Sequence, residues 1–190
     1  MREYIEKALQ EHYQAIKDID LERIEEISRE IINCYRNKGK VVVFGNGGSA
    51  ADAQHIVGEL VGKFQTERES LPAIALNTNA SVVTAVGNDY GFNAIFKRQI
   101  EGLVNGKDLA IGISTSGNSE NVVEGLLKAK EKGAKTVGFT GKGGGKMKDI
   151  VDILLDVPSG GTPRIQEGHI TAGHIICGLV EKEIFSEEEK

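Results

Sequence analysis

The sequence has few cysteines and no long apolar run, and each shortage excludes a class of protein. Only two of the 190 residues are cysteines, Cys34 and Cys177, and they stand far apart without metal-ligand spacing. Such a pair is typical of reduced thiols in the cytosol, not of a disulfide framework. No segment approaches the roughly 18 consecutive apolar residues that a membrane-spanning helix needs.

Basic charge is also scarce. The chain has 23 Lys and Arg against 28 Asp and Glu, a formal charge of −5, whereas nucleic-acid binding depends on Lys and Arg that neutralise phosphates. The first twenty residues are charged throughout and lack the apolar run of a secretory signal. We therefore expect a cytoplasmic protein that binds neither nucleic acid nor membrane. A small phosphorylated ligand remains compatible, because it needs only a few local donors.

Apolar, β-branched runs alternate with helical patterns along most of the chain. The runs predict strands, and periodic stretches between them, the last ending near Phe185, predict helices; the expected strands are 40–45, 72–76, 108–114, 135–141 and 149–157. This alternation favours an open, doubly wound α/β domain with a five-stranded parallel sheet. We expect one domain over 1–190, with N-terminal helices in 1–37 and an α/β core in 38–190.

The N-terminal helices carry an apolar stripe that includes Ile24, Ile27 and Ile31. Two interpretations remain open from the residues alone. The stripe caps the sheet of its own chain, or it packs against other subunits as a helical bundle.

The first expected strand leads into a glycine-rich turn, GNGGSA at 45–50. Its glycines let the backbone approach a ligand closely, and the helix that follows Ser49 presents free N–H groups to an anion. The turn also fits a dinucleotide fingerprint, but the next strand ends Leu-Asn-Thr at 76–78, without the acidic residue that would hold a ribose. A tight packing turn is the alternative.

A second turn, STSGNS at 114–119, follows the third expected strand. Its hydroxyl groups and the N–H groups of the next helix together suit a phosphate, whereas a simple helix cap would explain only one or two of the residues. The turn GKGGGK at 141–146 is one residue too short for a nucleotide P-loop, and Met147 occupies the position of the Mg²⁺-binding hydroxyl. We interpret it as a solvated turn.

His55 and Glu59 stand four residues apart on one helix face, where they can share a divalent metal or form a plain surface pair. Gln166 and His174 lie eight residues apart on the last helix, a rise of about 12 Å. They reach one ion only if the helix bends or if another subunit contributes. We interpret His12 and His169, which have no such neighbours in sequence, as ordinary exposed or packing histidines.

Five segments occur in an order and spacing that resemble the bacterial phosphoheptose isomerases of the sugar isomerase (SIS) family, over nearly the whole chain: GNGGSAADAQH at 45–55, VGNDYGF at 86–92, GISTSGNSENV at 112–122, TGKGGGKM at 140–147 and RIQEGHITAGH at 164–174. The resemblance implies a flavodoxin-like sheet and a homotetramer with active sites at subunit interfaces and bound zinc. It also implies interconversion of sedoheptulose 7-phosphate and D-glycero-D-manno-heptose 7-phosphate, which supplies heptose for cell-surface polysaccharide such as lipopolysaccharide.

The resemblance also implies a role for each matching residue. The sugar would contact Asn46, Gly47, Gly48, Asn88 and Asp89. The phosphate would be held by Ser114, Thr115, Ser116 and Ser119. The metal and the reacting carbons would be surrounded by His55, Glu59, Gln166 and His174. Enediol chemistry needs a base and an acid, and Glu59 and His174 are our candidates. Whether Glu59 is base, metal ligand or both stays open, since a ligated carboxylate is a weaker base.

Two other functions in the same fold remain as alternatives. One is a non-catalytic paralogue that binds the bacterial replication initiator, which the TERESLPAIALNT segment at 66–78 resembles; that paralogue lacks the Glu and His found here at 59 and 174. The other is an isomerase for another phosphosugar. Departures from the family pattern are Lys63 in place of Arg and Thr162-Pro163 in place of an acidic residue, which bears on the sugar or anomer preferred.

Overall fold

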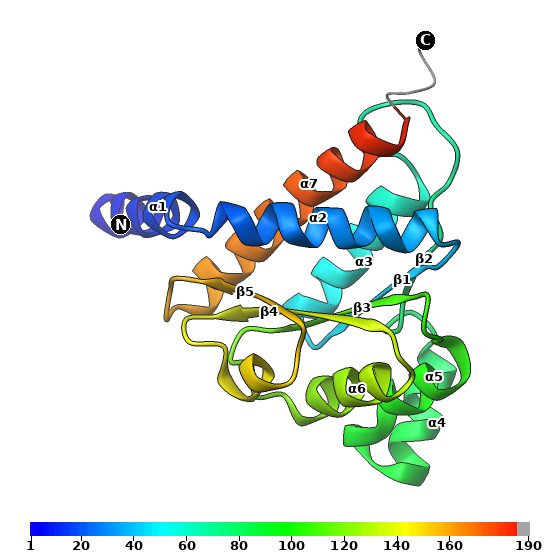
Figure 1. Cartoon of the computed structure of the whole chain (residues 1–190). Helices are drawn as coiled ribbons and strands as arrows, with labels where there is room; N and C mark the ends of the chain where they lie inside the picture. Colours follow the sequence, from blue (N-terminus) through cyan, green and yellow to red (C-terminus); the bar gives the residue numbers. More distant parts are fainter. Residues whose placement is uncertain (186–190) are drawn as a thin grey trace.

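The computed structural model describes residues 1–185 (Figure 1). Helices and strands alternate after two N-terminal helices, with two short 3₁₀ segments, η1 and η2: α1 Arg2–Lys17, α2 Leu21–Arg36, β1 Val41–Gly45, α3 Gly48–Val61, β2 Ala73–Ala75, α4 Ala80–Tyr90, η1 Phe92–Ala94, α5 Ile95–Leu103, β3 Leu109–Ser114, α6 Glu120–Glu131, β4 Lys135–Gly141, η2 Gly145–Asp149, β5 Ile153–Val157 and α7 Thr162–Phe185. Within residues 1–185, no helix has the length and apolar character to cross a membrane.

The five strands form one parallel sheet in the order β2-β1-β3-β4-β5. This order is the flavodoxin-like one, in which the chain reverses direction across the sheet between β1 and β3. The predicted doubly wound α/β fold is therefore confirmed. Ligands of such sheets bind beyond the carboxyl ends of the strands at this reversal, where the turns at 45–50 and 114–119 both lie.

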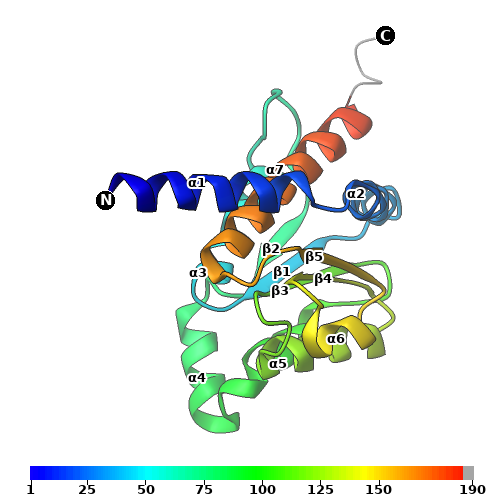
Figure 2. The same cartoon turned by 90° about the vertical axis from the view of Figure 1, so that its left-hand side faces the viewer.

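Alternate residues of the buried strands enter two apolar layers. Val41 and Val43 point into a layer shared with α2, α3 and α7, whereas Val42 and Phe44 point into a layer shared with α5 and α6. Figure 2 shows the helices on the two sides of the sheet. A strand buried on both faces needs a continuously apolar sequence, and β1 and β3 have one.

The two N-terminal helices differ in their packing. In α2, Ile24, Ile27 and Ile31 are buried against the sheet layer, so this helix caps its own sheet. The N-terminal end of α1 instead projects from the body of the molecule (Figure 1). Its only buried residue is Ala15, and four large apolar side chains remain 56–77% exposed: Tyr4, Ile5, Leu9 and Tyr13.

The expected strand at 149–157 is wrong in its first half. Residues Gly145–Asp149 form η2, and β5 begins only at Ile153. Three glycines at the start of this segment, 143–145, have positive φ, so the chain turns sharply and buries Met147 against α6 and its neighbours. An apolar pattern alone did not reveal this turn.

Candidate active site

The two glycine-rich turns are joined by a pair of amide side chains. Asn46 donates to Asn121 Oδ1 at 2.8 Å, and Asn121 donates back to Asn46 Oδ1 at 2.9 Å. Asn121 is buried in the first turn of α6. This reciprocal pair fixes the turn after β1 to the helix after β3. Asn46, a predicted sugar contact, is therefore held beside the predicted phosphate turn.

The hydroxyl groups of the 114–119 turn gather at the start of α6. The hydroxyls of Ser114 and Ser119 lie 2.9 Å apart, and Ser116 is 3.4 Å from Ser114. Ser119 precedes the helix but makes no side-chain cap hydrogen bond, which leaves first-turn N–H groups to a ligand. Thr115 is half-buried in the same turn. The structure thus brings together all four predicted phosphate ligands.

The 141–146 turn packs under this cradle and is more than a solvated connection. Lys146 N donates to Asn118 Oδ1 at 3.0 Å, and Gly117 lies against Gly144. At Gly117 the φ is +65°, and a Cβ would lie 2.1 Å from the Gly144 carbonyl oxygen. Only glycine fits both the backbone conformation and the contact.

Gly117→Ala should therefore lower the free energy of unfolding by about 3 kcal/mol and raise KM for a phosphosugar, because the cradle and the turn beneath it must separate. Urea unfolding and steady-state kinetics measure the two effects. Gly143→Ala is the matched control, since Gly143 also has positive φ (+89°) but open space around its Cβ position. It should cost only about 1 kcal/mol. Equal losses in the two variants would contradict the packing argument.

Three predicted metal ligands meet on the outer surface of α3 and α7. His55 Nε2 is 3.0 Å from Glu59 Oε1 and 3.1 Å from His174 Nε2, and His174 Nε2 is 4.0 Å from the same carboxylate oxygen. One donor atom from each residue lies within 4.8 Å of the others. Two facing imidazole nitrogens need a shared proton or a shared cation between them. The set is thus spaced to hold one metal ion.

Gln166 lies apart from this trio. Its amide rests on the first turn of α3, where a Cβ at Gly48 would be 2.3 Å from Nε2. Because α7 is one continuous helix, Gln166 remains about 12 Å of helix rise from His174. Within one chain the structure therefore places Gln166 beside Gly48, at the ligand-binding edge of the sheet, and not with the metal trio.

Asn88 and Asp89, the other predicted sugar contacts, lie in the last turn of α4. Both side chains are exposed, and Asn88 donates to Asp89 Oδ1 at 2.8 Å. The single chain thus presents the predicted site as separate groups on α3 and α7, on the 114–119 turn, and on α4.

Sequence reasoning missed several groups near these residues. Asn77 donates to the Gly45 carbonyl at 2.6 Å, while its Oδ1 is buried and has no hydrogen-bond partner among residues 1–185. The Phe64 ring lies 5.7 Å from the His174 ring, and Arg68 with Glu181 forms a buried ion pair behind it. No local motif marks these residues, because each depends on segments that meet only in the fold.

The remaining two histidines, His169 and His12, lie outside the candidate site and contact other parts of the fold. His169 is fully buried with Nε2 2.9 Å from the Thr140 carbonyl oxygen, and burial lowers its pKa to about 4; its interpretation as a packing residue is confirmed. The sequence suggested no partner for His12, but in the structure its Nδ1 lies 2.8 Å from a carboxylate oxygen of Glu167. Glu167 also pairs with Arg164, which donates to the Ala8 carbonyl and so fastens α1 to α7.

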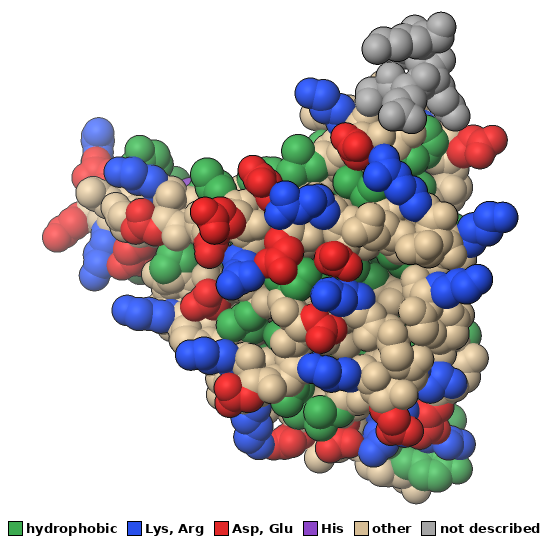
Figure 3. Space-filling model, viewed as in Figure 1, with side chains coloured by type: hydrophobic (Ala, Val, Ile, Leu, Met, Phe, Trp, Pro, Cys, Tyr) green, Lys and Arg blue, Asp and Glu red, His purple; other side chains and the backbone are tan. Residues whose placement is uncertain are grey.

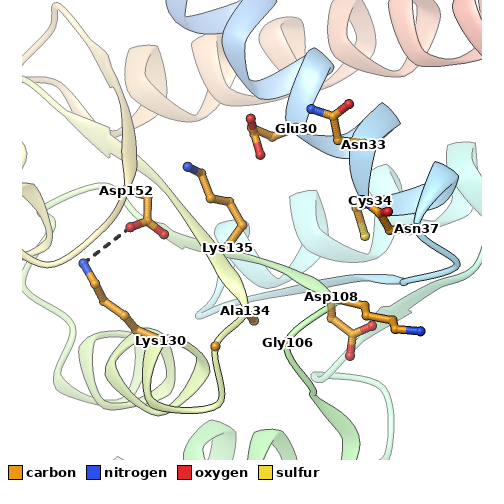
Figure 4. Close-up of a pocket in the computed structure, with 12 residues that line it drawn as sticks. Glu30, Asn33, Cys34, Asn37, Gly106, Asp108, Lys130, Ala134, Lys135 and Asp152 are labelled. Carbon is orange, nitrogen blue, oxygen red and sulfur yellow. Dashed lines mark ion pairs between the residues drawn. The ribbon is translucent and has the colours of Figure 1, made fainter.

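A hollow of about 530 Å³ lies at the opposite, amino-terminal edge of the sheet (Figure 4). Two of the acids that line it, Asp108 and Asp152, have structural partners. Asp108 accepts from the main chain and side chain of Lys40 at 3.0 and 2.6 Å, and Asp152 accepts from Thr136 N and Oγ1 at 2.8 Å. These bonds stabilise the starts of the strands.

On the face shown in Figure 3, acidic and basic side chains are interspersed without a continuous patch of one sign.

Known proteins resemble this chain in sequence and in overall fold. The SIS domain family model matches residues 3–141. The phosphoheptose isomerase of Geobacter sulfurreducens is 61% identical over 146 residues, 77% of each chain, and that of Sulfurimonas denitrificans is 47% identical over 192 residues, 98% of each chain. The solved phosphoheptose isomerase of Neisseria gonorrhoeae has a TM-score of 0.90 at 38% identity, covering 95% of this chain and 98% of that one. The chain belongs to the SIS domain family and, within it, to the phosphoheptose isomerases.

Proposed function

We propose that the protein converts sedoheptulose 7-phosphate to D-glycero-D-manno-heptose 7-phosphate, an aldose–ketose isomerisation that begins the synthesis of activated heptose. The observation that carries this proposal is one carboxylate beside two imidazoles, with Glu59 Oε1 at 3.0 Å from His55 and 4.0 Å from His174. A base and an acid at this separation suit the transfer of protons between neighbouring carbons and oxygens. The hydroxyl-rich 114–119 turn supplies a place for the phosphate.

In the mechanism, Glu59 takes the proton from C1 of the open-chain ketose and returns it to C2. His174 donates a proton to the C2 oxygen, which gives a neutral enediol, and it takes the C1 hydroxyl proton back as the aldehyde forms. The phosphate, held by Ser114, Ser116 and Ser119, orients the sugar from its far end. This remote binding energy positions the reacting carbons.

Zinc is the proposed metal, and the donor spacing fits it. Tetrahedral zinc with Zn–N distances near 2.0–2.1 Å places neighbouring nitrogen ligands roughly 3.3 Å apart, and the two Nε2 atoms here are 3.1 Å apart. His55, Glu59 and His174 would hold the ion, with Gln166 a further ligand only if it comes from another subunit. A histidine nitrogen that binds zinc carries no proton, so His174 would act as the acid only where its Nε2 does not ligate the metal. Bound there, zinc would polarise the carbonyl and hydroxyl oxygens of the substrate.

The proposed assembly is a homotetramer in the cytoplasm with sites at subunit interfaces. Two observations support this assembly. The apolar side chains of α1, among them Ile5 and Leu9, are exposed by more than half, and Ile175 on α7, next to His174, is 44% exposed. The second observation is that Asn88 and Asp89, the proposed sugar contacts on α4, lie apart from the metal trio within one chain, so a second subunit would complete the site. Cys34 and Cys177 are free buried thiols, which suits a reducing compartment.

Proton NMR of the protein with sedoheptulose 7-phosphate in D₂O, with and without added zinc, tests the proposed reaction. We expect an aldoheptose phosphate with deuterium at C2, because the enediol exchanges its proton with solvent through Glu59. The anomeric signals identify the first product formed. If neither the product nor deuterium exchange is detected, with or without zinc, the proposed function is contradicted.

A further inference from the structure

A buried carboxylate on α7 holds the segment that follows α3. Glu181 is 3% exposed and accepts hydrogen bonds from three consecutive main-chain N–H groups, those of Phe64, Gln65 and Thr66, at 2.8–2.9 Å. It also accepts from Thr66 Oγ1 at 2.9 Å and from Arg68 Nε at 2.8 Å. Five donors on one carboxylate fix this segment closely against α7.

Arg68 extends the same network to the end of α3. Its guanidinium donates to the main-chain carbonyls of Glu59 at 2.7 Å and Leu60 at 3.0 Å. These carbonyls belong to the last turn of the helix, where acceptors lack partners within the helix. Arg68 therefore caps α3 and contacts the main chain of the candidate base itself. We name Arg68, Glu181 and the five bonds to this carboxylate the clasp.

The clasp also reaches the candidate acid. Glu181 and His174 are seven residues apart on α7, which places them on one side of the helix two turns apart. Phe64, held through its N–H, lies with its ring 5.7 Å from the His174 ring. A Cβ at Gly178 would lie 3.2 Å from this phenyl ring, so Phe64 fills the space between α7 and the segment. One network thus fixes the main chain at Glu59 and the surroundings of His174.

We propose that Arg68 and Glu181 are positioning residues, which hold Glu59 on α3 and His174 on α7 at the separation that proton transfer requires. This inference deepens the isomerase function proposed above and rests on it. Neither residue touches the substrate in this scheme. Arg68 acts through the Glu59 carbonyl, and Glu181 acts through Arg68 and Phe64.

Glu181→Gln tests the role with little change of shape. An amide places a donor where the carboxylate accepts, so part of the clasp must open. We expect kcat to fall about 10- to 100-fold, the scale of a displacement of about 1 Å in a catalytic group. KM for sedoheptulose 7-phosphate should stay within about threefold, because the phosphate cradle lies on the separate 114–119 turn. Glu183→Gln is the matched control, an exposed carboxylate two residues away that pairs with Arg36.

Arg68→Lys is the second variant, for use if Glu181→Gln does not fold. It keeps a positive charge beside Glu181 but lacks the forked donors that reach the Glu59 and Leu60 carbonyls. The same fall in kcat, at an unchanged KM, is expected. A folded variant with kcat within twofold of the wild type overturns the proposal, as does a fall that Glu183→Gln shares equally.

The imidazole NMR signals separate this proposal from the function on which it rests. The chain has only four histidines, so the rings of His55 and His174 are readily assigned. In Glu181→Gln these two signals should shift while those of His12 stay in place, and Glu183→Gln should shift none of them. If the wild-type protein isomerises no heptose phosphate, the function fails, yet these shifts still support the clasp. Unchanged His55 and His174 signals in Glu181→Gln overturn it.

Discussion

Glu59→Gln should lower kcat about 1,000-fold while the fold stays intact. General base catalysis contributes about 10²- to 10⁴-fold, and an amide of the same size cannot take the proton from C1. The side chain is only 23% exposed, so solvent does not readily replace it. Steady-state product formation measures the rate, and circular dichroism with gel filtration checks the fold.

The control for this variant is Glu131→Gln, which changes an exposed carboxylate paired with Lys128 on α6. It should retain wild-type turnover. Zinc content measured on Glu59→Gln separates the two roles left open for this residue. Lost turnover with retained zinc indicates a base, and joint loss indicates a ligand. A rate within tenfold of the wild type would exclude Glu59 as the base.

Lowering the pH from 7 to 2 should reduce the free energy of unfolding of the wild-type protein more than that of Glu181→Gln. Burial raises the pKa of Glu181, but hydrogen bonds from the N–H groups of Thr66, Phe64 and Gln65 outweigh burial and lower the pKa from 4.5 to about 2. A carboxylate with a lowered pKa stabilises the fold at pH above its unfolded value, near 4.5. That stabilisation is lost as the pH falls toward 2. The shift corresponds to on the order of 3 kcal/mol.

Urea unfolding at several pH values between 7 and 2 measures this effect. At pH 7 the variant should be less stable than the wild type by a few kcal/mol, because the amide replaces one of the two acceptor oxygens and the donors on that side lose their partner. The two curves of unfolding free energy against pH should converge as the pH approaches 2. Curves that stay parallel over this range would show that Glu181 does not titrate with the lowered pKa.

The sequence predicted the parts of the protein whose signals are local. Continuous β-branched runs such as VVVF at 41–44 marked buried strands, and the spacing of His55 and Glu59 put both on one helix face. The 114–119 turn was marked by its hydroxyl groups. Each of these signals lies within one element, so no knowledge of the packing was needed.

Other features depend on contacts between distant segments and could not be predicted. Arg68 meets Glu181 across 113 positions of sequence, and Asn46 meets Asn121 across 75. Gln166 was expected to join the metal trio only through a bent helix or another subunit, and within one chain the packing of α7 on α3 places it against Gly48. Which face of a helix meets which partner is decided by the whole core, not by the residues of that helix.

The clasp has a consequence for how such an enzyme can be altered. Enzymes often gain heat resistance by substitutions that relieve strain in the active site and slow the reaction. Here one carboxylate both anchors a loop to the core and holds the reacting groups in register. Substitutions of Glu181 should therefore lower stability and kcat together, and selection for either property preserves the other.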